Sequence, residues 1–335
     1  MNPYVGIKRR SLDLKNGDWP YQKNMGIRGL LGFLKDHDCM SPLEGPLWPP
    51  NSVIAVDVPI FAHKFAYSER TIPGIFRRML AFGHELRGLQ AEPIFVFDGA
   101  KLALKDSERR ARAAARDRGL ERLRTKQSQD MEALLQGIEG PEGIVIKAPC
   151  VAPSSEDDPH VFQGLLFPTA KDYRALESVL QEAAFKTARA KYEAEALCAH
   201  LTREGQAYAV LTEDSDVLAF GATRAIFKYT TEPAVYELSR VLERLGFTMD
   251  QFVDLCCLFG CDFCTNIYMF GPQSAYRSLQ KHGSWPAIWA SIQEVPLTVF
   301  SHANMMRSLQ ESEAFNALYP EVRQCFLSAA HERDP

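Results

Sequence analysis

The chain has 335 residues, of which 46% are hydrophobic and 24% are charged, so it has the composition of an ordinary globular protein with one large or two small domains. No stretch approaches the roughly 20 apolar residues of a membrane span, and residues 1–24 lack the apolar core of a signal peptide. The net charge of −4 gives no overall sign of a nucleic-acid-binding protein.

Short β-branched runs predict buried strands at residues 52–57, 93–98, 207–214 and 224–229. A helical stretch, about 73–89, separates the first two runs, and another precedes the third. The alternation of strand and helix predicts an α/β fold: a central, mostly parallel sheet with helices on both faces.

A basic segment follows the second predicted strand. From Lys101 to Lys126 there are ten basic and four acidic residues, so this segment carries +6 and the rest of the chain −10. Such a run is usually a solvated helix or disordered, but it can also bind phosphates. Lys105 and Arg112 lie seven residues apart, which places them on one face of a helix.

Three of the predicted strands stop at, or just before, an aspartate: Asp57, Asp98 and Asp214. The carboxyl ends of parallel strands line one edge of a sheet, where ligands bind. Asp216 follows Asp214 by two residues, in LTEDSDVLAF. One aspartate at a strand end is common turn chemistry, but three together predict a cluster.

Three more acids are candidates for the same cluster. Glu193 and Glu195 lie at a predicted helix start, where acids are also favoured electrostatically, so by themselves they read as first-turn glutamates. Asp262 ends the apolar segment FVDLCCLFGCDF, either as a helix-end residue or as a site residue that faces inward.

Packed carboxylates need neutralisation. Two unit charges about 4 Å apart repel by about 4 kcal/mol at an effective dielectric constant near 20. Either some of the acids are protonated or the group holds cations, for which Mg²⁺ is the best fit because it prefers oxygen ligands and works beside phosphates. Two such ions could hold a phosphodiester and activate a water, and the basic segment would then bind substrate phosphates.

The eight cysteines mostly lie inside apolar runs, which indicates reduced thiols in an intracellular protein. Cys257, Cys261 and Cys264 are close in sequence, but no second pair with zinc-site spacing follows. Zinc is therefore the less favoured interpretation.

Five segments in order resemble the flap endonuclease/XPG superfamily of structure-specific 5′ nucleases. AVDVPIFAHK, TEDSDVLAFG and GCDF lean toward its exonuclease-1 branch as much as toward flap endonucleases. The resemblance covers about Met25 to Trp289. The segments are MGIRGLLGFL, VFDGAKLALK, YEAEA, LTEDSDVLAFG and FVDLCCLFGCDF. The resemblance implies a PIN-like core with a helical arch and a helix–two-turn–helix DNA-binding element.

The resemblance also implies roles for individual residues. Two divalent metals, Mg²⁺ with Mn²⁺ as a substitute, would be held by seven acids: Asp57, Asp98, Glu193, Glu195, Asp214, Asp216 and Asp262. Lys105 and Arg112 would steer the scissile phosphate, and K⁺ is a further candidate ligand at the helix–two-turn–helix. The expected DNA contacts are Gly26, His63 (by stacking on a base), Lys101, Arg109, Gly271 and Gln273.

Several positions depart from the family pattern. Lys191 replaces a proline that commonly precedes the glutamate pair, and Met269, Gln273 and Ser274 replace a glycine and basic residues of the helix–two-turn–helix. Residues 1–24 precede the Met-Gly at which the family's chain usually begins. No convincing sliding-clamp peptide is evident near the C-terminus, so that contact stays open.

These features predict one nuclease core with flanking segments. Residues 1–24 form an extension and 25–290 the core. Within the core we expect a first region at 25–130 with the arch at about 99–136, a loop or insertion at 137–169, an internal region at 170–262 and the helix–two-turn–helix at 263–290. Residues 291–335 form a helical tail.

The expected function is metal-dependent 5′ cleavage of DNA at flaps, nicks or ends, in replication, repair or recombination. The protein would be a monomer with DNA as its partner, no membrane contact, and a location in the nucleus or at a site of viral DNA replication. Two alternatives stay open: a non-catalytic DNA-structure-binding protein with the same fold, and an RNA-directed nuclease with the same metal site.

Overall fold

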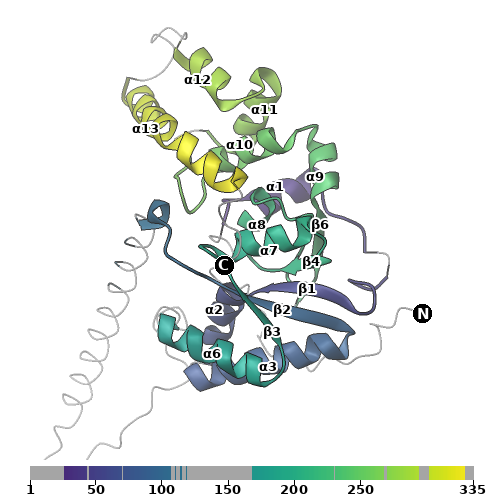
Figure 1. The fold of residues 1–335 in the computed structure, drawn as a ribbon. Coiled ribbons are helices and arrows are strands. Elements are labelled where there is room, and N and C mark those ends of the chain that lie inside the picture. Colours follow the sequence, from purple (N-terminus) through teal and green to yellow (C-terminus); the bar gives the residue numbers. More distant parts are fainter. Residues whose placement is uncertain are drawn as a thin grey trace, which may run out of the picture.

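The computed structural model describes residues 26–43, 45–69, 71–106, 168–229, 231–267, 270–293 and 302–328, together with three single positions of the basic segment. Six strands form one sheet in the order β3-β2-β1-β4-β5-β6 (Figure 1). Their bounds are β1 Ser52–Asp57, β2 Ala91–Phe97, β3 Lys186–Arg189, β4 Ala209–Leu211, β5 Arg224–Phe227 and β6 Ala234–Glu237. Among these strands only the β5–β6 pair is antiparallel, which confirms the mostly parallel α/β sheet.

Helices cover both faces of the sheet, as predicted (Figure 1). The helices around the sheet are α1 Leu30–Asp36, α2 Val58–Glu69, α3 Ile72–Gly88, α6 Ala170–Glu182, α7 Ala194–Arg203, α8 Asp216–Ala219 and α9 Leu238–Leu245. Alternate strand residues face opposite ways: Ile54 and Val56 join the core formed with α2, α3 and α6, whereas Ala55 joins the core formed with α1, α7 and α8.

The strand order explains why several chain segments meet at one edge of the sheet. From β1 the chain moves to β2 and β3 on one side, and it then returns to β4 on the other side of β1. The carboxyl ends of parallel strands at such a reversal form a natural ligand site. The residues that follow β1, β2 and β4 are therefore brought together.

Four further helices pack beyond this edge: α10 Met249–Phe259, α11 Pro272–His282, α12 Trp285–Gln293 and α13 His302–Leu327. A reciprocal capping box between Thr248 and Gln251 starts α10. α10 contacts both α11 and α13, so the described part of the C-terminal region packs against the core. No described helix is both long enough and apolar enough to cross a bilayer.

Two differences from the sequence prediction concern short strands. The predicted strand at 207–214 is ordered as a strand only over Ala209–Leu211, and the antiparallel edge strand β6 was not predicted. Beyond Leu211, Thr212 N still donates to Ile226 O of β5 at 3.3 Å, whereas Asp214 N donates to the Thr212 side chain at 2.9 Å. β6 has only four residues, too few for a clear periodic signal.

Two glycines of α3 give a matched test of the packing against β3. A Cβ added to Gly83 would lie 2.6 Å from Phe185 Cζ, whereas one added to Gly88 meets nothing within 4 Å. The Phe185 ring cannot move away easily, because it is 4% exposed and packs edge-on against Phe95 at 5.5 Å. We predict that Gly83→Ala lowers the free energy of unfolding by about 1–2 kcal/mol through overpacking.

Gly88→Ala is the control, and it should leave stability unchanged or raise it by up to about 1 kcal/mol through helix propensity. Denaturant unfolding of both variants measures the difference. Equal effects of the two substitutions would show that α3 does not press on Phe185 as described.

Candidate metal centre

Three carboxylates form a compact group at the sheet edge: Asp98, Glu193 and Glu195 each offer an oxygen within 4.8 Å of the others. Asp98 directly follows β2, Glu193 is the N-cap residue of α7, and Glu195 lies in the first turn of that helix. Asp98 Oδ1 accepts a hydrogen bond of 2.9 Å from Ala194 N, which satisfies an otherwise unpaired amide at the helix start. The helix entrance thus holds all three acids together.

Close backbone contact fixes this group. Gly99 N donates to Tyr192 O and Ala100 N donates to Lys191 O, each at 2.8 Å. A Cβ on Gly99 would lie 1.9 Å from Ala190 O, so only glycine permits the two backbones to approach this closely. The segment after β2 is therefore pinned to the segment that leads into Glu193.

A second group of acids lies around the start of α8 and just beyond the end of α10. Asp216 N donates to Asp214 Oδ1 at 2.9 Å. A Cβ on Gly26, whose φ is +68°, would lie 2.2 Å from Asp214 Oδ1. Ile27 N donates to Ser215 Oγ at 2.9 Å and Arg28 N to Gly260 O at 3.0 Å. Residues 26–28 thus bind both the segment with Asp214 and Asp216 and the loop that carries Asp262.

Asp57 lies beside both groups at the end of β1. Thr212 Oγ1 donates to Asp57 Oδ2 at 2.7 Å. Burial, with the charges of Asp214 and Asp98, raises the pKa of Asp57 to about 8 against the lowering effect of that hydrogen bond. The Asp57 carboxyl is therefore costly to ionise in the metal-free protein.

The same physics acts on the other members. Asp98 reaches solvent on one side, but the surrounding protein desolvates it and, with the charge of Glu193, raises its pKa to about 6. Burial raises the pKa values of Glu195 and Asp216 well above the usual range, and neighbouring carboxylates add to the shift. The charges of all seven predicted acids act on one another or on Lys105, so the structure brings them into one cluster, named here the acidic cluster.

Lys105 lies inside the acidic cluster. Its Nζ is 2.5 Å from Glu193 Oε2 and 3.6 Å from Asp262 Oδ2. Burial alone would lower the pKa of Lys105, but the charges of Glu195, Glu193, Asp262 and Asp216 outweigh it and raise the pKa well above its usual value. The sequence placed Lys105 on an arch helix, whereas its side chain partly neutralises the acids from the 3-10 turn η2 Ala103–Lys105.

The acidic cluster fits a divalent cation. Both carboxylate oxygens of Asp216 are buried, and no hydrogen-bond partner meets them within the described residues. A buried carboxylate without donors is unfavourable, and an oxygen-only ligand set suits hard cations such as Mg²⁺ or Mn²⁺. Asp98, Glu193 and Glu195 could hold one cation, and Asp214, Asp216 and Asp262 offer oxygens for another.

The remaining predicted residues are placed separately. His63 is half-buried on α2, and Lys101 is exposed just before η2. Gly271 is the N-cap residue of α11, and Gln273 in its first turn approaches His37, with 3.4 Å between Nε2 atoms. Arg109, Arg112 and Met269 lie outside the described residues.

The structure also describes Lys191, which departs from the family pattern, and two of the cysteines considered for zinc. Lys191 is exposed, and its ammonium lies 5.5 Å from the centre of the Tyr192 ring. Cys261 and Cys264 are free thiols with sulfurs 3.6 Å apart. Among the described residues the one group of three potential metal ligands is the carboxylate set, so the cysteines give no support for zinc.

Sequence reasoning missed three supports of the acidic cluster. Thr212 lies two residues before Asp214, and a hydroxyl at a strand end is a signal of a bond to the neighbouring strand end. Gly99 follows Asp98 directly, and glycine beside a strand-end acid is a signal of close backbone approach. The contact of Ser215 with Ile27 joins residues 188 positions apart, and no local pattern reveals it.

The raised pKa values predict a pH-dependent stability for the metal-free protein. The folded chain retains protons on Asp57 and Asp98 up to about pH 8 and about pH 6, whereas an unfolded chain loses them near about pH 4. Since the folded state binds more protons in between, the free energy of unfolding falls as the pH rises from about 4 to about 8.

Divalent cations bind the ionised carboxylates, so the increase in Tm caused by Mg²⁺ should be larger at about pH 8 than at about pH 6. Thermal unfolding in EDTA and in Mg²⁺ across this range measures both trends. An increase that is constant or shrinks with pH would contradict the assignment.

Asp216→Asn tests the unpaired carboxylate. The amide is uncharged and can donate to neighbouring carboxylates, so we predict that the metal-free variant is more stable than wild type by about 1–3 kcal/mol. The same change should remove most of the Mg²⁺-induced rise in Tm. Asp36→Asn, at an exposed position on α1, is the control and should leave both quantities unchanged. A destabilised Asp216→Asn that keeps its Mg²⁺ response would refute the assignment.

Comparisons with known proteins agree with this geometry. Residues 25–119 match the family model described as the XPG N-terminal domain, and residues 184–262 match the XPG I-region. Flap endonuclease 1 of Entamoeba histolytica is 30% identical over 283 residues, which cover 78% of this chain and 68% of that protein.

Two solved structures share the fold. The catalytic core of Rad2 in complex with DNA substrate has a TM-score of 0.59 at 18% identity, with 92% of this chain and 87% of that chain covered. Flap endonuclease-1 from Methanococcus jannaschii has a TM-score of 0.51 at 19% identity, with 83% and 78% covered. Given the two domain matches and the extended similarity to a flap endonuclease, the chain belongs to the flap endonuclease/XPG superfamily of nucleases.

Proposed function

We propose that the protein is a structure-specific 5′ nuclease that hydrolyses DNA phosphodiesters at flaps, nicks or ends with two divalent cations, Mg²⁺ by preference and Mn²⁺ as a substitute. The observation that carries this proposal is the acidic cluster: carboxylates from separate chain segments meet at one sheet edge, and Asp216 has two buried oxygens without hydrogen bonds among the described residues. A cluster this unfavourable by itself is expected where cations complete it.

The acids have the role of holding the cations. Cations bound there would polarise a phosphodiester and activate the attacking water. Glu193 and Glu195 are fixed by the start of α7, Asp98 by its bond to Ala194 N, and Asp57 by Thr212. Such fixed ligands preserve the cation geometry through the reaction.

Lys105 is proposed to meet the scissile phosphate. Its ammonium already lies among the site carboxylates, 3.6 Å from Asp262 Oδ2. A phosphate that enters the acidic cluster comes within reach of this ammonium, which is a strong point donor for phosphate oxygens. Arg112, with Lys101 and Arg109, is proposed to extend this positive surface.

The duplex part of the substrate is proposed to contact the other predicted residues. Gly271 is the N-cap residue of α11, and the unpaired amides of a helix N-terminus suit a phosphate. Gln273 lies in the same first turn, and the backbone there is a candidate K⁺ site. Gly26 and His63 are proposed to lie near the cleaved strand, His63 by stacking on a base.

The setting of this activity follows from its substrate. The Rad2 core was solved with a DNA substrate, and the relatives named flap endonuclease 1 belong to cellular organisms. We therefore propose DNA as the partner of this chain, with a role in replication, repair or recombination, inside the cell and in the nucleus of a eukaryote. The domain boundaries predicted above remain part of the same proposal.

A substrate panel with a 5′ label tests the proposal directly. We predict that wild type with Mg²⁺ cuts a 5′ flap, a nicked duplex or a 5′-ended duplex, and that the preferred member distinguishes flap cutting from exonuclease digestion. Asp214→Ala should lower the cleavage rate by about 100-fold or more, because it removes a cation ligand.

Glu182→Ala removes an exposed acid on α6 and serves as the control, with a rate within about twofold of wild type. Equal cutting by Asp214→Ala and wild type would refute the metal centre. Tight binding of branched DNA in EDTA without cleavage in either cation would instead favour the non-catalytic DNA-binding alternative. Cleavage only of the ribose version of the panel would favour the RNA-directed one.

A further inference from the structure

The C-terminal helix α13 reaches the segments that carry two of the site acids. The Phe326 ring lies 4.9 Å from the Phe220 ring and 5.3 Å from the Phe263 ring, the latter edge to face. Phe220 is the C-cap residue of α8, which begins with Asp216, and Phe263 directly follows Asp262. Phe326 therefore packs between two acid-bearing segments, and the three rings are named here the aromatic cluster.

The aromatic cluster also contacts Lys105. The Lys105 ammonium lies 5.1 Å from the centre of the Phe263 ring, within the range of a cation–π interaction. The same ammonium is bonded to Glu193 and close to Asp262. The Phe263 ring thus contacts both the Phe326 ring and the Lys105 ammonium.

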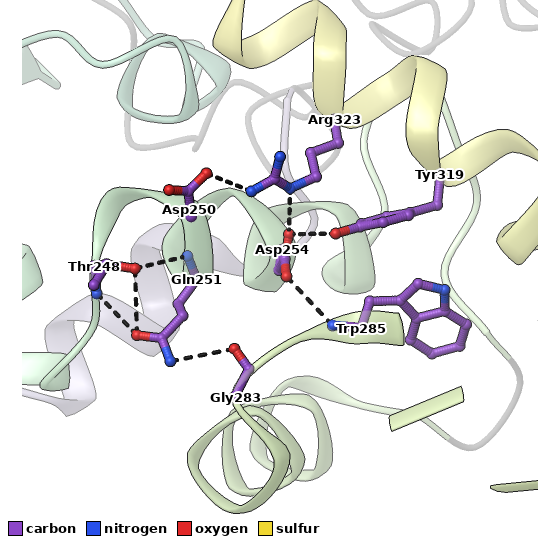
Figure 2. Close-up of polar contacts among 8 residues, drawn as sticks. All are labelled: Thr248, Asp250, Gln251, Asp254, Gly283, Trp285, Tyr319 and Arg323. Atoms are coloured by element: carbon purple, nitrogen blue, oxygen red, sulfur yellow. Dashed lines mark hydrogen bonds and ion pairs between the residues drawn. The ribbon is translucent and has the colours of Figure 1, made fainter. Parts of the chain in front are cut away.

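A polar clamp fixes α13 to the helix that delivers Asp262. Asp254, 2% exposed on α10, accepts hydrogen bonds at Oδ1 from Tyr319 OH at 2.6 Å and Arg323 Nε at 3.0 Å (Figure 2). Its other oxygen accepts from Trp285 N at 3.3 Å, and Arg323 also pairs with Asp250. A buried carboxylate with three donors is well satisfied, so α13 has a defined position on α10.

The spacing of residues along α13 links the clamp to the acidic cluster. Tyr319, Arg323 and Phe326 follow one another at intervals of four and three residues, so they share a face of α13. The clamp holds the first two on α10, whose last residue is Phe259, three positions before Asp262. The third then presses on Phe263 beyond the end of α10.

Ordinary core packing also buries phenylalanines, and Phe315 on the same helix is an example. Phe315 is 4% exposed, like Phe326, and packs edge-on against Trp285 at 4.8 Å. Its described aromatic contacts are with Trp285 and Tyr319, neither of which adjoins a site acid. The two residues are thus a matched pair: equal burial on one helix, with one ring next to the acidic cluster and one away from it.

We propose that Phe326 is a positioning residue of the metal centre, which holds Asp262 and Lys105 in place through Phe263. α13 is in this respect part of the nuclease site rather than an appended tail. The inference rests on the proposed function, since it names a residue that supports the same cation-binding acids. Residues that orient metal ligands typically affect metal affinity or activity by about 10- to 100-fold.

The test compares Phe326→Ala with Phe315→Ala in the full chain. Calorimetric titration with Mn²⁺ measures cation affinity without a reaction, and single-turnover cleavage at saturating DNA measures the chemical step. We expect Phe326→Ala to weaken Mn²⁺ binding and to slow single turnover by about tenfold or more. Phe315→Ala should lower Tm comparably and leave both quantities within about twofold of wild type.

Phe326→Leu keeps most of the apolar volume, so it is the variant to use if Phe326→Ala does not fold. Compared with Phe326→Ala, it should recover part of the Mn²⁺ affinity and of the single-turnover rate. Phe326→Tyr keeps the ring and should recover more. Equal effects of Phe326→Ala and Phe315→Ala on Mn²⁺ binding and single turnover would overturn the positioning role.

Failure of the underlying function gives a different result. If wild type neither binds Mn²⁺ in the titration nor cuts any member of the DNA panel, the proposed nuclease fails and Phe326 has no metal centre to position. If wild type does both and Phe326→Ala is indistinguishable from wild type, only the positioning role fails.

Discussion

The burial and mutual repulsion of clustered carboxylates are the constraint on which this structure depends. Desolvation and neighbouring negative charges raise the pKa values of Asp57, Asp98, Glu195 and Asp216. Contacts within the described residues offset only part of this cost: Thr212 donates to one oxygen of Asp57, and Lys105 contacts Glu193 and Asp262. The fold therefore spends stability to keep the acids close, which is expected where function needs a preorganised cation site.

The sheet topology makes that concentration of charge possible. β1 lies between β2 and β4, so the acids that follow these strands meet although 41 to 157 positions separate them in sequence. Two close approaches then fix the edge: Gly99 against the backbone before Glu193, and Gly26 against Asp214. Beyond the sheet, α10 leads into the loop with Asp262, and Phe326 of α13 packs on the neighbouring Phe263. Strand order and close backbone contacts between distant chain segments hold the acidic cluster together.

Local sequence patterns predicted much of the sheet and several of the site acids. Uninterrupted apolar strands followed by aspartates predicted both the parallel sheet and the meeting of Asp57, Asp98 and Asp214, because strand direction alone places their ends at one edge. Whether Glu193 and Glu195 face the sheet edge could not be read from helix periodicity, because residues two apart on a helix point in different directions. Their direction depends on where the preceding strand enters the helix. The short β6 gave no periodic signal.

The other features depend on tertiary packing. The role of Lys105 was predicted from the family resemblance, and its spacing to Arg112 predicted only a shared helix face. Its place among the acids depends on the path of the chain after Asp98. The position of Phe326 depends on the docking of α13 through Asp254, a contact between residues 69 positions apart in the case of Arg323. The measurement that tests the account most directly is a crystal structure with Mn²⁺ and its anomalous difference map. The account predicts peaks between Asp98, Glu193 and Glu195 and beside Asp214, Asp216 and Asp262, and an empty acidic cluster at saturating Mn²⁺ would contradict it.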